Sequence, residues 1–160
     1  MKHKRKLLIK KFYLSIFICL CIQTYGQDKA NQQDSIAVVE TINQFVHAFS
    51  NLEWEKFDSF FANDATAFFP PSARFPYRAN NKQEIEKIFK GVFEHAKENK
   101  SAPPYIVIEP KDVKIQMVGP IAIVSFILND PGMLGRRTIV LKKENERWLI
   151  IHLHASGVPV

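Results

Sequence analysis

The chain has 160 residues, 46% of them hydrophobic and 24% charged, and its 22 basic and 16 acidic residues give a formal net charge of +6. Six basic residues and no acidic ones lie in residues 1–26, so residues 27–160 carry 16 charges of each sign. Without a basic excess, that part of the chain lacks the electrostatic footprint of a nucleic-acid-binding protein. Its length fits one domain with a substantial core.

The first 26 residues have the order of a secretory signal peptide. A basic segment, Met1–Lys11, precedes an apolar run, Phe12–Ile22, and Thr24-Tyr25-Gly26 resembles a cleavage site. The run is shorter than the roughly 20 residues that a spanning helix needs. We expect cleavage near Gly26 and a periplasmic or secreted protein that is not held in the membrane. An uncleaved amino-terminal anchor is the alternative. Both cysteines lie in this segment, so residues 27–160 offer no thiol.

Residues 27–34 are predicted to form a polar leader. Residues 35–160 are predicted to form one domain that begins with helices. A first helix is predicted to Phe49, a short second one after the capping box Ser50/Glu53, and a third after the capping box Asn81/Glu84. A short strand, Ala65–Phe69, is expected before the third helix. The helical stripes are Ile36, Val39, Ile42, Phe45, Val46 and Phe49, then Trp54, Phe57, Phe60 and Phe61, and then Ile85, Ile88, Phe89, Val92 and Phe93.

The second half of the chain is rich in strand patterns. Five strands are predicted: Tyr105–Glu109, Val113–Val118, Ile121–Leu128, Arg137–Lys143 and Arg147–Ala155. Their connections are too short for parallel crossovers, which indicates antiparallel pairing. Helices followed by an antiparallel sheet define an α+β fold.

Two of these strands are apolar on both faces. Ile121–Leu128 and Leu149–Leu153 lack the polar alternation of a sheet with one face in water. One face is expected to pack on the helices. The other needs a partner, most simply a second copy of the chain. The sequence therefore predicts a homodimer formed through the outer face of the sheet.

The last strand combines polar and apolar residues in alternation. Because side chains alternate across a strand, Trp148, Ile150, His152, His154 and Ser156 are expected to share one face. Two histidines and a serine behind a tryptophan indicate the polar lining of a pocket.

The closing sequence resembles the nuclear-transport-factor-two-like superfamily, and within it SnoaL-like proteins and the association domain of calmodulin-dependent kinase. The residues that carry the resemblance are Trp148, Ile150, His152, His154, Ser156, Gly157 and Pro159 at the end, Phe57, Phe61 and Asp64-Ala65-Thr66 earlier, and Arg136-Arg137-Thr138-x-Val140. The resemblance covers residues 35–159. It implies a cone-shaped, curved antiparallel sheet wrapped around three amino-terminal helices, with a pocket at the wide end. Members include isomerases, dehydratases, hydrolases and oligomerisation modules, so the fold alone does not fix the function.

Several residues are candidates for such a pocket. His152 and His154 could serve as acid and base, since histidine titrates near neutral pH, or could simply hydrogen-bond in the pocket wall. Trp54 and Tyr77 are expected to line the pocket, and an arginine, chiefly Arg136 with Arg74 and Arg78 as alternatives, to hold a carboxylate. Ser156 is the remaining residue that is expected to contact a ligand in this pocket. The two histidines could also be metal ligands, but no third ligand is marked by spacing, so we expect neither metal nor cofactor.

Three functional hypotheses remain. The chain is an exported SnoaL-like domain that binds a small, partly apolar and anionic molecule, with His152, His154 and an arginine as contacts. Alternatively, it is an isomerase or hydrolase that uses one of these histidines as acid or base. A third hypothesis is an oligomerisation module. The chemistry of ketosteroid isomerases is not carried over, because the first helix lacks a tyrosine.

Overall fold

The computed structural model describes residues 32–70, 78–130 and 132–160. The chain divides into two units, Met1–Ile36 and Ala37–Val160. Of the first unit only the helical residues 32–36 are described, so the predicted signal peptide lies outside the described residues. Residues 32–34, predicted as part of the leader, are helical. No helix in the described ranges is long and apolar enough to cross a membrane.

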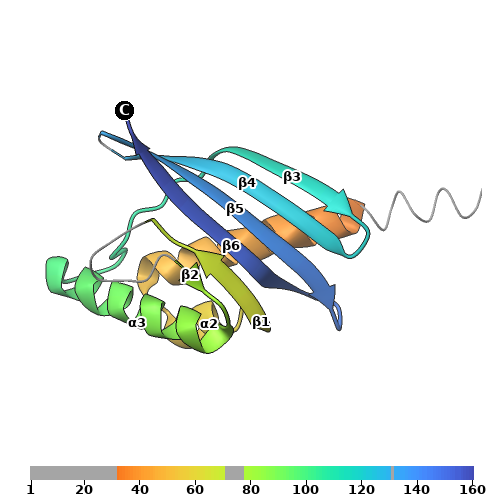
Figure 1. The fold of residues 1–160 in the computed structure, drawn as a ribbon, viewed down its shortest axis with the longest axis horizontal. Helices are drawn as coiled ribbons and strands as arrows, with labels where there is room; N and C mark the ends of the chain where they lie inside the picture. The colour runs from red at the N-terminus through yellow and green to blue at the C-terminus, as the bar shows by residue number, and fades with distance from the viewer. Residues whose placement is uncertain (1–31, 71–77, 131) are drawn as a thin grey trace, which may run out of the picture. The chain divides into compact units, whose positions relative to one another are not determined.

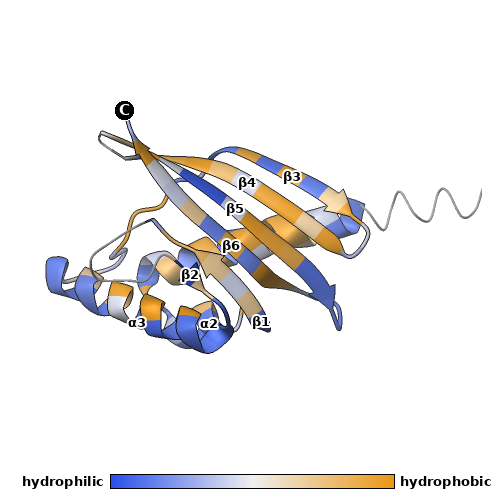
Figure 2. Cartoon of the chain, viewed as in Figure 1, coloured by the Kyte–Doolittle hydropathy of each residue, from blue (hydrophilic) through white to orange (hydrophobic). Residues whose placement is uncertain are grey.

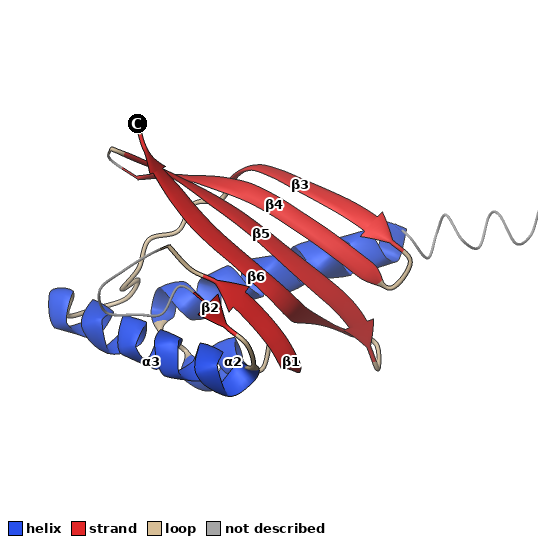
Figure 3. Cartoon of the chain, in the orientation of Figure 1, coloured by secondary structure: helices blue, strands red, loops and turns tan. Residues whose placement is uncertain are grey.

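The described chain is an α+β fold, as predicted, with helices before a curved, open sheet (Figure 1). A first helix spans residues 32–51. The other elements are α2 (Trp54–Asp58), β1 (Phe61–Phe68), β2 (Arg78–Ala79), α3 (Lys82–Asn99), β3 (Lys111–Val118), β4 (Ile121–Asp130), β5 (Met133–Glu144) and β6 (Arg147–Pro159). The strand order is β2-β1-β6-β5-β4-β3 (Figure 3).

Strands β3 to β6 form an antiparallel meander, as the short connections predicted. β1 joins the other side of β6 in parallel, and β2 pairs with β1. The predicted strand Tyr105–Glu109 is wrong, because this segment joins no sheet. The backbone N–H groups of Tyr105 and Ile106 donate instead to the carbonyl of Ser50, at 2.8 and 3.1 Å. Tyr105, Ile106 and Ile108 pack against the core, which explains most of the apolar run, whereas Val107 is exposed.

The start of α3 agrees with its predicted capping box. The side chain of Asn81 accepts from the backbone N–H of Glu84 at 2.9 Å, and the carboxylate of Glu84 accepts from the N–H of Asn80 at 2.8 Å. The predicted capping box at Ser50 is wrong. The first helix continues through residue 51, and α2 begins only at Trp54, with no side-chain cap at Glu53.

The core lies between the helices and one face of the sheet, here called the inner face. Phe57, 1% exposed, is at its centre, with ring centroids of Phe89, Phe45 and Phe93 at 4.7, 5.1 and 5.3 Å. The inner face contributes Ala122, Val124, Phe126, Ile139, Leu141, Ile150 and Leu153. Figure 2 shows this apolar character along most of β4. Burial of these side chains is the main favourable contribution to folding.

Replacing the α3 cap tests the observed start of this helix. We expect Asn81→Ala to lower the free energy of unfolding by about 1 kcal/mol, because the N–H of Glu84 loses its partner. Chemical denaturation measures the difference. Gln83→Ala, exposed in the same helical turn, is the control and should change stability by less than half as much. Equal effects of the two substitutions would contradict the cap.

Candidate functional site

A β-bulge in β6 determines which side chains of this strand face the helices. Val140 of β5 pairs with His152, but the next residue, Leu141, pairs with Ile150. Ile151 is therefore an extra residue in β6. Because neighbouring residues of β5 point to opposite faces, Ile150 and His152 also lie on opposite faces.

The prediction that Trp148, Ile150, His152, His154 and Ser156 share one face of the last strand is therefore wrong. Trp148 and Ile150 are buried on the inner face, at 4% and 0% exposure. Beyond the bulge, Leu153 and Ala155 take the inner positions. His152, His154 and Ser156 lie on the opposite, outer face. None of these three residues appears in the described lining of the two cavities below, and their role in binding a ligand stays a prediction.

An apolar cavity of about 290 Å³ lies between the helices and the inner face, and it is called the apolar cavity below. Its size is close to the lower end for small-molecule sites, roughly 300 Å³. The helices contribute Phe45, Val46, Phe49, Ile88, Phe89 and Val92; the sheet contributes Phe126, Leu128, Ile139, Leu153, Ala155 and Arg137; Phe69, Pro70 and Ile108 complete the lining. Arg137 is the only polar residue in this lining, as far as the described chain shows.

Arg137 is held along the sheet by backbone carbonyls. Its Nη1 donates to the carbonyl of Ser156 at 3.0 Å and to that of Arg136 at 2.9 Å. Gly135 leaves room for this arrangement, since a Cβ there would lie 3.3 Å from Nη1. Arg136, the arginine predicted to hold a carboxylate, is exposed on the outer face and pairs with Ser156. Counting back in steps of two from the buried Ile139 would have selected Arg137.

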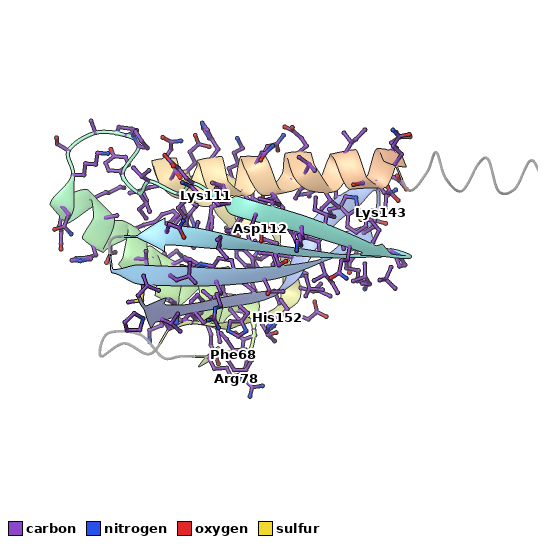
Figure 4. All side chains as sticks on the ribbon, turned by 90° about the horizontal axis from the view of Figure 1, so that it is seen from above. Phe68, Arg78, Lys111, Asp112, Lys143 and His152 are labelled. Atoms are coloured by element: carbon purple, nitrogen blue, oxygen red, sulfur yellow. The ribbon has the colours of Figure 1, made fainter. Side chains whose placement is uncertain are left out.

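A second, polar cavity of about 520 Å³ adjoins the first. Five residues line both cavities: Phe49, Val92, Ile108, Leu128 and Arg137. The polar cavity adds Glu109, Lys111 and Asn129, together with Ile106 and Val107. Figure 4 shows Lys111 at the start of β3. Sequence patterns did not indicate these polar residues, because they come from a non-strand segment and from strand ends.

The remaining predicted ligand contacts do not gather at the cavities. Trp54 packs against the ring of Phe93, with centroids 5.8 Å apart, and its ring lies 4.8 Å from Nζ of Lys90. It is absent from the linings described for both cavities. Tyr77 and Arg74 lie outside the described residues.

His152 and His154 belong to a cluster on the outer face, near the edge formed by β1 and β2 (Figure 4). Thr66 Oγ1 lies 2.8 Å from Nδ1 of His152. The ring of Phe68 is 5.8 Å from that of His152 and 6.0 Å from that of His154, and Arg78 lies 5.5 Å from the Phe68 ring. Burial, and secondarily the neighbouring His154, lowers the pKa of His152. Within the described ranges no three potential metal ligands converge.

The family of the chain follows from a comparison with family models. A model described as a SnoaL-like domain matches residues 38–160, so the chain belongs to the SnoaL-like family. This confirms the resemblance seen in the sequence. No curated protein matches the chain.

Solved structures share the fold at low sequence identity. A Streptomyces avermitilis protein of the NTF2-like family, provisionally described as a dehydratase, has 19% identity and a TM-score of 0.66, and the match covers 81% of this chain and 99% of that one. A Parabacteroides distasonis protein provisionally described as a ketosteroid isomerase has 17% identity, a TM-score of 0.56 and coverages of 76% and 85%. A Xanthomonas campestris protein provisionally described as a calcium/calmodulin-dependent protein kinase II association domain has 19% identity, a TM-score of 0.53 and coverages of 76% and 86%. At these identities the likeness shows the fold alone.

The lowered pKa of His152 predicts a pH dependence of stability. The folded protein binds a proton at this ring less readily than the unfolded chain, whose pKa is near 6.5. The stabilising contribution of the neutral His152 ring to the free energy of unfolding is therefore fully present above pH 6.5, and it is lost as the pH falls below that value. We expect the Tm of wild type to fall more steeply below pH 6.5 than that of His152→Gln, measured by thermal unfolding. The exposed and non-ionisable Gln83→Ala is the control and should keep the wild-type slope. An unchanged slope in His152→Gln would contradict the role of this ring.

Proposed function

We propose that the protein binds a small, mainly apolar molecule with an anionic group, and that the molecule occupies the apolar cavity. The observation that carries this proposal is a cavity of about 290 Å³ with Arg137 as its single described polar residue. Apolar walls supply affinity in proportion to the surface that they remove from water. An arginine supplies orientation, because its planar guanidinium matches a carboxylate or phosphate. The SnoaL-like fold agrees with such a role.

Binding is favoured over acid–base catalysis by the chemistry of the same lining. A general acid or base must lie within hydrogen-bond reach of the substrate. The described lining of the apolar cavity contains no carboxylate, histidine or hydroxyl group, and arginine does not lose its proton in proteins. His152 and His154, the predicted acid and base, lie on the outer face.

We also propose that the protein is exported and that it forms a homodimer. The basic and apolar order of residues 1–26 supports export with cleavage near Gly26. The outer face supports a homodimer, since Ile123, Ile127 and Val140 are only partly buried there in the single chain. A second copy would cover these side chains.

A dye with an apolar body and a sulfonate, anilinonaphthalenesulfonate, tests the apolar cavity. We expect the folded protein to bind it with enhanced fluorescence. Arg137→Met should weaken the affinity about tenfold, since hydrogen bonds to charged groups contribute roughly 1.5–3 kcal/mol. Ala155→Phe should abolish binding, because Ala155 lines the cavity and the larger ring fills it.

The matched control for Ala155→Phe is His154→Phe, one residue away on the opposite face. It should leave dye binding unchanged. Thermal unfolding of each variant separates loss of binding from loss of the fold. If His154→Phe or His152→Ala abolishes binding while Ala155→Phe retains it, the ligand occupies the histidine cluster and the proposal is wrong.

Native mass spectrometry of the protein recovered from its source compartment tests export and assembly together. We expect a polypeptide that begins at Gln27 and a mass of two copies. Val140→Glu, in the middle of the outer face, should give a single copy because it would bury a charge in the interface. Gln83→Glu on α3 is the control and should remain a dimer. A polypeptide retaining residues 1–26 would refute the cleavage, and a single-copy wild type would refute the dimer.

A further inference from the structure

Two rows of paired residues cross the middle of the outer face, from β4 through β5 to β6. The first row consists of Ile123, Val140 and His152, and the second of Ser125, Thr138 and His154. We call these residues the central patch. His152 and His154 are its only ionisable side chains, so the patch carries no charge while both imidazoles are neutral. Its other side chains are hydrocarbon or hydroxyl groups.

The groups in direct contact with the two imidazoles are neutral. Thr66 Oγ1 lies 2.8 Å from Nδ1 of His152, and the ring of Phe68 lies 5.8 and 6.0 Å from the rings of His152 and His154 (Figure 4). His152 is partly buried in the single chain, and this burial, with the neighbouring His154, lowers its pKa. A proton added to either ring would therefore find no carboxylate among these contacts to offset its charge.

The charged side chains around the central patch are mainly cationic. The cations are Arg136 and Lys142 on β5, Lys114 on β3 and Arg78 on β2, and the carboxylates are Asp64 on β1 and Glu144 on β5. Glu144 lies 2.8 Å from Nζ of Lys142, and Asp64 also favours the charged form of that lysine. Both carboxylates thus act at one end of the patch. Protonation of the imidazoles would add positive charge to a surface on which these cations already outnumber the carboxylates.

We propose that the central patch is the contact between two copies of the chain, and that the dimer forms only while His152 and His154 are neutral. This inference rests on the proposed homodimer and adds its regulation by pH. A two-fold symmetric contact uses the same patch on both copies, so protonation brings like charges from each copy into one interface. An uncharged centre with charged groups around it is the composition typical of a protein interface.

Sedimentation equilibrium of the recovered protein measures the dissociation constant of the dimer as a function of pH. Histidine gains its proton as the pH falls through and below about 6.5. We expect the dimer to dissociate at least about tenfold more readily at about pH 5 than at about pH 7.5, because the charges would be buried without partners. Circular dichroism at both pH values establishes that the single chain stays folded.

Substitutions on β6 assign the pH dependence to the two imidazoles. His152→Gln combined with His154→Gln should give the same dissociation constant at both pH values. His154→Lys, at an exposed position, should weaken the dimer already at neutral pH because its charge is permanent there. Ser156→Ala is the matched control, since Ser156 takes the next outer position of the same strand and does not titrate. This variant should keep the wild-type pH dependence.

The outcomes distinguish this inference from the proposals on which it rests. A wild-type dimer with the same dissociation constant at both pH values, or a double glutamine variant that keeps the wild-type dependence, overturns the inference and leaves the dimer. Undiminished association of His154→Lys places the central patch outside the contact and also overturns it. A single copy at neutral pH overturns both the inference and the dimer, whereas binding in the apolar cavity is decided separately by the dye.

Discussion

The bulge at Ile151 is the constraint on which the arrangement of the site depends. By inserting one residue in β6, it places Leu153 and Ala155 against the helices and moves His152 and His154 to the outer face. In a regular strand the two imidazoles would face the phenylalanines of the apolar cavity. Burying polar groups there without partners would cost free energy. The bulge thus keeps the interior apolar and gives His152 a hydroxyl partner, Thr66, at 2.8 Å.

Much of the fold could be predicted from the sequence, because its signals are local. The apolar stripes predicted three helices, and Asn81 with Glu84 marked the start of α3. The bulge left no comparable mark. Ile150 and Ile151 are both apolar, so the alternation of β6 does not show where the register slips. The choice between Arg136 and Arg137 failed for a related reason. Two identical neighbours are distinguished only by the register of β5, which Ile139 sets from the core side.

The segment Tyr105–Glu109 shows how a correct pattern can indicate the wrong structure. Three of its four apolar residues, Tyr105, Ile106 and Ile108, do pack against the core. Its backbone, however, bonds to Ser50 at the end of the first helix instead of to a neighbouring strand. Hydrogen-bond partners far apart in sequence are not visible in a hydrophobic pattern. The same segment lines the polar cavity with Ile106, Val107, Ile108 and Glu109. The segment that was predicted to be a strand is therefore part of the candidate site.

Arg137 gives the candidate site its chemical character. Nearly all of its neighbours in the apolar cavity are hydrocarbon, and an ionic interaction is stronger in such surroundings than in water. Two backbone carbonyls fix the guanidinium, so little side-chain entropy remains to be lost when a ligand binds. A permanently protonated group can orient an anion but cannot accept a proton from it. The described lining of the apolar cavity thus combines one fixed guanidinium with apolar walls, an arrangement that agrees with the proposed binding of a mainly apolar, anionic molecule.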